Sequence, residues 1–394
     1  MNRNKKISLF FLCSFVVTAI FALLYYICGN DSSQSNRTMV TISDSTMLDV
    51  KSYTIKKIKI GNRITNIPIS SQIVRKEGKD KYMLLDESEL YIFDFDSGEL
   101  EDSISLGKCG NLNVYSGFNY INDDTILVYN YQEKFIFVIN HNGDVFAKWS
   151  LPRNNKKIKW LPSANALNAS RIGFYSPTIV VSGGILGSLY ESGLDNIPVS
   201  EKLDINTEKW KIELTYTDKY LKQNLGAIYL NRIYTTTDNS GHFLYSFPVD
   251  EKVYRFNSDF TVCDTLFIQS RYDNGRVEEC DKSQKEIEQD DNYEIQYFVS
   301  QLSYSNILYD PYRDLLIRVV NHPLNNWKRD EVFIQPRSFI ICDANGKVLS
   351  ESCILTDYSN LYFDNMHISS KGLVVAERSD DENYISFRCY NIRK

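Results

Sequence analysis

Histidine and proline are scarce in this sequence, which has 4 histidines and 9 prolines among 394 residues. No HExxH motif occurs and the histidine spacings do not repeat, so a metal site built from several histidines is not expected. The 8 cysteines include no CxxC pair, which removes the usual signal for zinc. Neither GxSxG nor a cysteine-protease signature is present. The sequence therefore predicts no catalytic residue, no metal and no cofactor.

Aromatic side chains, by contrast, are abundant. Tyr 27, Phe 21 and Trp 4 make up 13% of the chain, and aromatic residues favour strands. The net charge is −6, and it becomes −9 when the first thirty residues, with their three cationic side chains, are left out. No nucleic-acid partner is expected for such an acidic chain.

The first thirty residues have the pattern of a membrane-targeting segment. Arg3, Lys5 and Lys6 precede an uncharged, mainly apolar stretch at 7–28. Twenty-two helical residues would span about 33 Å, enough to cross a bilayer, whereas the apolar part of a cleaved signal usually has about 7 to 15 residues. The length favours an uncleaved anchor, and the preceding positive charges place the rest of the chain outside the cytoplasm.

Cys28 offers a second interpretation of the same segment, a lipoprotein signal. This cysteine follows the apolar stretch and begins a polar tract, as in a lipidated bacterial N-terminus, but Ile27 stands where a lipobox has a small residue. Both interpretations predict attachment to a membrane of the cell envelope: the outer membrane with lipidation, the inner membrane with an uncleaved anchor. The predicted organisation is an anchor or signal at 1–30, a tether at 31–47 and a folded domain at 48–394.

One pattern recurs along the folded domain: an alternating apolar strand, a short polar turn and a second strand. Turn centres lie at spacings that suit the blades of a β-propeller, each of which has four strands. The five copies of this hairpin are 90–106, 134–151, 202–216, 253–268 and 337–355.

Further strands are predicted ahead of three of the hairpins. They are 117–120 and 125–129, 227–234 and 242–247, and 306–309 and 315–320. A sixth unit has only three strands, at 363–368, 373–377 and 384–392, and the segment 50–60 can supply the fourth and close a ring. We therefore predict an all-β, six-bladed propeller with four-stranded blades, while seven blades, a β-sandwich and two small β domains remain alternatives. The segment 271–294, dense in charge, predicts a solvated insertion, partly helical at 282–289.

The chain resembles a known family. The resemblance rests on the N-terminal segment with Cys28, on SNILYDPYRDLLIRVV (305–320) followed by Pro323, and on FDNMHISSKGLVVAE (363–377). These features are similar to a Bacteroidota family of uncharacterised envelope lipoproteins with TolB-like six-bladed propellers. The resemblance implies this architecture and an envelope location, and it implies no established activity.

Three residues are weak candidates for binding: Asp310, Arg313 and His322. Asp310 and Arg313 fall in a turn between two strands, where hydrogen bonding within the turn is the plainer interpretation. His322 follows an inner strand, and a loop there could reach the mouth of a propeller channel. His141 is expected to be solvated in a hairpin turn, and the DFDSGELE stretch at 94–101 is expected to be a hairpin turn and not a calcium loop.

Two functions follow from these expectations. The favoured one is a non-catalytic, membrane-tethered module that binds a protein, peptide or glycan, or serves as a scaffold. The alternative is a hydrolase or lyase that acts on glycans or peptides in the central channel. The alternative requires at least two carboxylates, or His322 with a carboxylate, to converge there.

Overall fold

The computed structural model describes most of residues 47–393. The residues it leaves undescribed in that range are 62–63, 65–67, 69, 114, 153–167, 169, 185–188, 190–196, 227, 274–276, 288, 325–326, 328–333 and 380. The predicted anchor at 1–30, with Cys28, and nearly all of the predicted tether lie outside the described residues. Among the described helices, none is both long enough and apolar enough to span a bilayer.

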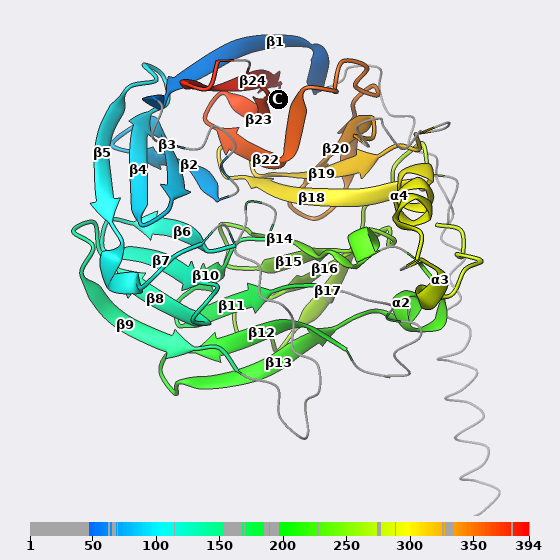
Figure 1. Ribbon diagram of the computed structural model, residues 1–394, viewed down its shortest axis with the longest axis horizontal. Coiled ribbons are helices and arrows are strands. Elements are labelled where there is room, and N and C mark those ends of the chain that lie inside the picture. Colours follow the sequence, from blue (N-terminus) through cyan, green and yellow to red (C-terminus); the bar gives the residue numbers. More distant parts are fainter. Residues whose placement is uncertain are drawn as a thin grey trace, which may run out of the picture. The chain divides into compact units, whose positions relative to one another are not determined.

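The described strands form six antiparallel sheets of four strands each, arranged as the blades of a propeller (Figure 1). This confirms the predicted fold class, and each of the five predicted hairpins is the outer half of a blade. Blade one contains β2 (Ser71–Lys76), β3 (Lys79–Asp86), β4 (Glu89–Asp94) and β5 (Leu100–Ser105), and blade two contains β6 (Gly117–Asn122), β7 (Thr125–Asn130), β8 (Phe135–Ile139) and β9 (Val145–Ser150).

The third and fourth blades continue the same meander. Blade three contains β10 (Gly173–Tyr175), β11 (Thr178–Ser182), β12 (Pro198–Asp204) and β13 (Lys209–Thr215), and blade four contains β14 (Tyr234–Thr237), β15 (Phe243–Ser246), β16 (Lys252–Phe256) and β17 (Cys263–Phe267). Blade five contains β18 (Ser303–Asp310), β19 (Leu315–Asn321), β20 (Arg337–Asp343) and β21 (Val348–Glu351).

The sixth blade is built from both ends of the domain. It consists of β22 (Leu361–Ser369), β23 (Gly372–Glu377), β24 (Tyr384–Ile392) and, at its outer edge, β1 (Leu48–Lys59). Strand β1 runs antiparallel to β24, with Leu48 opposite Ile392 and Ile58 opposite Ile385. The predicted closure of the ring by the segment 50–60 is thus confirmed, and β24 is not left as an open edge.

Apolar patterning explains how the blades pack. The second strand of a blade is covered on both faces by neighbouring blades, so that Ile126, Leu127 and Val128 of β7 are all fully buried. The outermost strand β9 alternates between half-buried and exposed residues instead. Separate apolar clusters fill the spaces between adjacent blades, and aromatic pairs such as Tyr82 and Phe387, 5.0 Å apart, join blade one to blade six.

The prediction of a strand at 227–234 was wrong. Residues Ile228–Asn231 form a 3₁₀ helix, η3, and β14 begins only at Tyr234. Tyrosine hydroxyls hold the carbonyls of this turn, since Tyr220 donates to Leu230 O at 2.8 Å and Tyr216 donates to Asn231 O at 2.5 Å. Apolar residues alternate along this segment as they would in a strand, but Leu230 packs into the core from a helical turn.

The insertion is partly helical, as expected, but it is not merely solvated. Helix α3 (Gln284–Ile287) lies within it, and α4 (Asp291–Ser300) begins at its end; α2 (Asp218–Lys222) precedes it, between blades three and four. Cys280 and Ile287 are buried in the same apolar cluster as residues of blades three and four. A few apolar side chains therefore dock this charged segment onto the propeller, which charge density alone did not predict.

Candidate functional site

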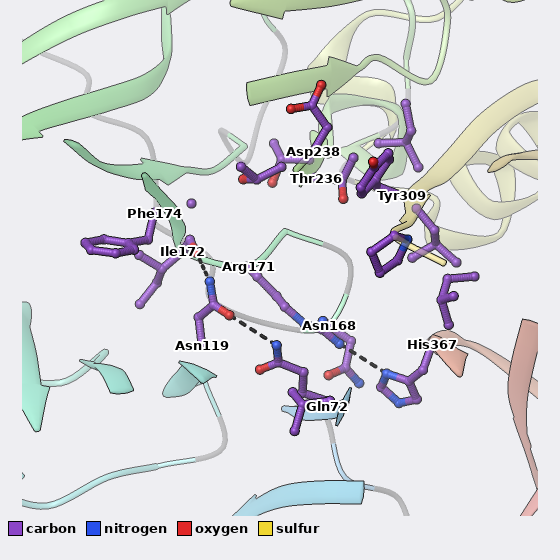
Figure 2. Close-up of a pocket in the computed structure, with 18 of the residues that line it drawn as sticks. Gln72, Asn119, Asn168, Arg171, Ile172, Phe174, Thr236, Asp238, Tyr309 and His367 are labelled. Atoms are coloured by element: carbon purple, nitrogen blue, oxygen red, sulfur yellow. Dashed lines mark hydrogen bonds between the residues drawn. The ribbon is translucent and has the colours of Figure 1, made fainter. Parts of the chain in front are cut away.

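The candidate site is a cavity of about 630 Å³ in the central channel, lined by the first strand of every blade. These innermost strands are β2, β6, β10, β14, β18 and β22, which surround the centre of the ring in Figure 1. The lining mixes aromatic residues, such as Phe174 and Tyr309, with amide, hydroxyl and cationic side chains (Figure 2). A cavity of this size and character suits a small ligand.

Side-chain amides on two neighbouring inner strands are fixed by hydrogen bonds. Gln72 of β2 accepts from Tyr120 N at 2.9 Å and donates to Tyr120 O at 3.2 Å. It also donates to Asn119 Oδ1 at 3.3 Å, and Asn119 donates to Ile172 O at 2.7 Å. The chain Gln72, Asn119, Ile172 visible in Figure 2 joins blades one, two and three, so these polar groups hold one geometry before any ligand arrives.

At one end of the cavity lies the Arg171 cluster, which consists of Ser71, Asn168, Arg171, Asn365 and His367. Arg171 Nη2 donates to Ser71 O at 2.8 Å and to His367 Nδ1 at 3.1 Å. A guanidinium has no acceptor, so His367 Nδ1 must be unprotonated, and the proton sits on Nε2, which donates to Asn365 Oδ1 at 2.5 Å. These three hydrogen bonds fix both the tautomer of the His367 imidazole and the direction of the Arg171 guanidinium.

Burial sets the protonation states in this cluster. Burial, followed by the positive charge of Arg171, lowers the pKa of His367 well below its usual range, so the imidazole is neutral at physiological pH. Burial also lowers the pKa of Arg171, to about 10, which still leaves the guanidinium charged. His367 therefore acts here as a neutral acceptor that orients a cation.

Carboxylates contribute little to the described lining. Only Asp238 brings one, and it is engaged by His242, whose Nδ1 lies 2.7 Å from Asp238 Oδ2. Among the residues that the structure describes, no group of three or more histidine, cysteine or acidic side chains is placed to hold a metal ion. The pair of carboxylates that a glycosidase requires is not assembled by the described lining.

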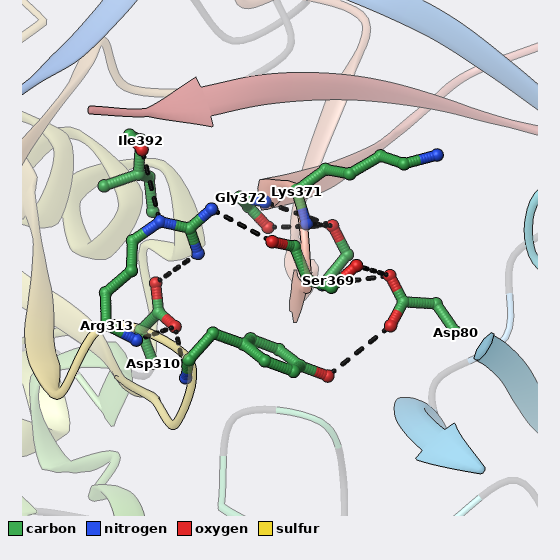
Figure 3. Close-up of polar contacts among 9 residues, drawn as sticks. Asp80, Asp310, Arg313, Ser369, Lys371, Gly372 and Ile392 are labelled. Atoms are coloured by element: carbon green, nitrogen blue, oxygen red, sulfur yellow. Dashed lines mark hydrogen bonds and ion pairs between the residues drawn. The ribbon is translucent and has the colours of Figure 1, made fainter. Parts of the chain in front are cut away.

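Asp310 and Arg313 do not line the cavity but occupy the turn between β18 and β19 (Figure 3). The Asp310 carboxylate is fully buried, accepts from Tyr312 N and Arg313 N, and pairs with Arg313 Nη1 at 2.9 Å. Arg313 also donates to Ile392 O at 3.2 Å and to Ser370 O at 3.0 Å. The predicted hydrogen-bonding role in the turn is confirmed, and it extends to the closing strand β24; a binding role stays a prediction.

His322 lies away from the cavity, at the end of β19. Its Nε2 lies 2.8 Å from Ser338 Oγ, and Ser338 in turn donates to Glu351 Oε1 at 2.9 Å. The single hydroxyl proton of Ser338 thus goes to the carboxylate and not to the imidazole, opposite to what activation of a serine requires. All three side chains are buried. Burial, then the charge of Arg337, lowers the pKa of His322 to about 4.

Two further expectations concern hairpin turns. His141 lies in the turn between β8 and β9, half-exposed, with Nε2 2.9 Å from Asp102 Oδ2. The stretch 94–101 contains the turn between β4 and β5, with Gly98 at a φ of +81°. Both segments are turns, as predicted.

Arg171 and Asn168 were not predicted as site residues. Each belongs to a stretch with little periodicity, and the residues that meet them come from blades one and six. The available signal was a polar residue on an innermost strand, as at Gln72, Asn119 and His367, but recognising it requires knowing which strand of each blade is innermost.

The fold and the sequence agree on a family. Residues 39–352 match a family described as a domain of unknown function, DUF4221. The chain belongs to this family. No curated protein matches the sequence.

Solved structures of two Bacteroides proteins have a similar fold. A member of the DUF4221 family from Bacteroides vulgatus is 16% identical, with a TM-score of 0.68 over 86% of this chain and 97% of that one. A protein from Bacteroides fragilis, whose name marks it as a candidate for export, is 9% identical, with a TM-score of 0.53 over 89% of this chain and 98% of that one. At these identities the likeness is one of fold. Together with the match over residues 39–352, it confirms the predicted resemblance to an uncharacterised propeller family, while lipidation stays a prediction.

Proposed function

We propose that this DUF4221 propeller is a non-catalytic binding module of the cell envelope, which takes its ligand in the central channel. The observation that carries the proposal is the lining of the cavity: polar side chains from several blades are held in fixed directions by one another. Preorganised polar groups in a channel of this volume favour selective binding, because little ordering is needed when the ligand enters.

The alternative, a hydrolase or lyase, has less support from the same cavity. The described lining offers one carboxylate, Asp238, already paired with His242. His322 is buried outside the cavity, and Ser338 lies between it and Glu351. No pair of groups with complementary acid and base roles meets in the described lining, so binding is the better proposal.

The N-terminal segment supports a place outside the cytoplasm and a tether to a membrane. The apolar stretch at 7–28 with its preceding positive charges carries this part of the proposal, and the Bacteroides fragilis relative, named as a candidate for export, is in keeping with it. Mass spectrometry of the native N-terminus distinguishes a diacylglyceryl group on Cys28 from a retained anchor. Recovery of the chain in the cytosolic fraction would contradict both.

Binding is tested with glycan and peptide arrays probed by the full chain. Thr236 lines the cavity, so Thr236→Trp should fill it, whereas Thr207 lies exposed in a turn of blade three and Thr207→Trp is the matched control. We expect the arrays to show at least one ligand that binds to wild type and to Thr207→Trp but not to Thr236→Trp. Blank arrays, together with no partner crosslinked in solubilised envelopes, would overturn the proposal.

A further inference from the structure

Arg171 has donors left over after its structural contacts. Both hydrogens of Nη2 are used, by Ser71 O and His367 Nδ1. Nε and Nη1, with three hydrogens between them, have no acceptor among the described residues. Because the two Nη2 bonds hold the planar group, the free donors keep a fixed direction, and Arg171 is one of the residues that line the cavity.

Asn168 adds a second unused donor beside Arg171. Its side chain lines the cavity, is only 6% exposed, and accepts from Ser71 N at 2.6 Å through Oδ1. Since Ser71 N can only donate, this bond fixes the orientation of the amide and leaves Nδ2 without a partner among the described residues. Burial of a donor without an acceptor lowers the stability of the folded state. Arg171 and Asn168 lie close together, because both form hydrogen bonds with the backbone of Ser71.

No acidic group of the described residues neutralises this end of the cavity. Among the described residues, none forms an ion pair with Arg171. The other arginine of the lining, Arg75, does have an acidic neighbour, with Nη1 3.7 Å from Asp80 Oδ1. The Arg171 cluster thus holds a partly buried cation that has surplus donors and no anionic partner among the described residues.

We propose that the channel binds a small organic molecule through a carboxylate, which the free donors of Arg171 and Asn168 receive. This inference rests on the proposed function and names the ligand class. Because both hydrogens of Nη2 are in use, neither two-donor edge of the guanidinium is complete, so the carboxylate would accept single charge-assisted hydrogen bonds from Arg171 Nη1 or Nε and a further one from Asn168 Nδ2. The aromatic and hydroxyl groups farther along the cavity, including Phe174, Thr236 and Tyr309, would contact the uncharged body of the ligand (Figure 2).

Calorimetric titration of the solubilised full chain tests this with matched pairs that differ only in charge. The pairs are benzoate and benzamide, N-acetyltyrosine and its amide, and glucuronate and glucose, with phenyl phosphate as a separate arm. We expect at least one carboxylate to bind about tenfold more tightly than its neutral partner. Equal binding within every pair, no carboxylate binding up to about 10 mM, or a preference for phenyl phosphate over benzoate would each overturn the inference.

Substitutions test whether Arg171 causes the preference for carboxylates over their neutral partners. Arg171→Gln should abolish it, while Arg75→Gln, which removes the other arginine of the lining, should leave it unchanged. If Arg171→Gln does not fold, Asn168→Asp serves instead, because it places a carboxylate oxygen at the unused donor position. We expect Asn168→Asp to lose carboxylate binding and to raise the melting temperature; binding that persists in it would overturn the inference.

Failure of this inference is distinguishable from failure of the proposed function. If arrays yield a neutral ligand that Thr236→Trp loses and Arg171→Gln keeps, the channel binds but not through a carboxylate. If neither arrays nor titrations yield a ligand for the channel, both fail.

Discussion

The Arg318 guanidinium lies over the ring of Tyr304, with 3.7 Å between its central carbon and the ring centroid. Arg318 is fully buried on β19 of blade five, and its donors reach into blade four: Nη2 donates to Asp250 O at 2.5 Å and Nη1 to Ile268 O at 2.7 Å. Burial lowers the pKa of Arg318, and carbonyl dipoles with the tyrosine face stabilise its charge. One side chain thus fastens two blades.

Arg318→Lys should destabilise the protein by about 3 kcal/mol, because an ammonium cannot reach the same set of carbonyls and buried acceptors lose their partners. The free energy of unfolding in urea measures this. The control is Arg378→Lys at an exposed position, where a change below about 0.5 kcal/mol is expected. Equal effects of the two substitutions would show that Arg318 is not a fastener.

Gly98 and Gly78 allow a comparison at nearly equal backbone angles, with φ of +81° and +80°. A Cβ on Gly98 would lie 2.5 Å from Lys57 O of the closing strand β1, whereas a Cβ on Gly78 would meet nothing within 4 Å. Gly78→Ala should cost about 1 kcal/mol from backbone strain alone, and Gly98→Ala about 2 kcal/mol more. Unfolding free energies that agree for the two variants would contradict the close contact of β1 with this turn.

Glu201 of β12 is 2% exposed and its Oε1 has no partner among the described residues. Burial raises its pKa to about 7. The folded state therefore favours the protonated acid, so stability is greatest below the unfolded pKa near 4.5 and falls as the pH rises toward 7.

Glu201→Gln should remove this loss, with a gain of about 3 kcal/mol at high pH and no change at about pH 4. Melting temperatures recorded against pH, with the exposed Glu99→Gln as control, measure the effect. A gain that does not depend on pH would refute the assignment.

Arg313→Gln should loosen the closure of the ring, because it breaks the contacts with Ile392 and Ser370 and leaves the buried Asp310 carboxylate without its counter-ion. The expected loss is about 3 kcal/mol, with faster hydrogen exchange in β24. Lys371→Gln is the control, since its ion pair with Asp96 is solvent-exposed and should contribute less than about 1 kcal/mol. Unchanged exchange in β24 would rule out a role of Arg313 in closure.

Local chemistry made most of the fold predictable. Gly98, Gly143 and Gly346 adopt positive φ in the turns of three of the five predicted hairpins, and strand alternation identified the blades. Tertiary contacts decided the rest: the apolar residues of 227–234 pack from a helical turn, and Cys280 and Ile287 anchor a segment whose charge suggested only solvation.

The candidate site was harder to predict than the fold. Its polar residues come singly from several innermost strands, so no spacing in the sequence links them. His367 contributes to the site through a positioning contact with Arg171. The role of Arg171 and Asn168 can be inferred only from their neighbours in the folded chain. Among the described residues, no carboxylate forms an ion pair with Arg171.

The pairing of β1 with β24 has a consequence for folding kinetics. Leu48 and Ile392 meet from opposite ends of the domain, so this contact has a very large sequence separation and a high loop-closure cost. The blades can form from local hairpins, but the ring can close only after the last strand exists. Before β1 and β24 pair, each presents an unpaired edge, and we expect the chain to be most prone to exchange strands with a second copy during this interval.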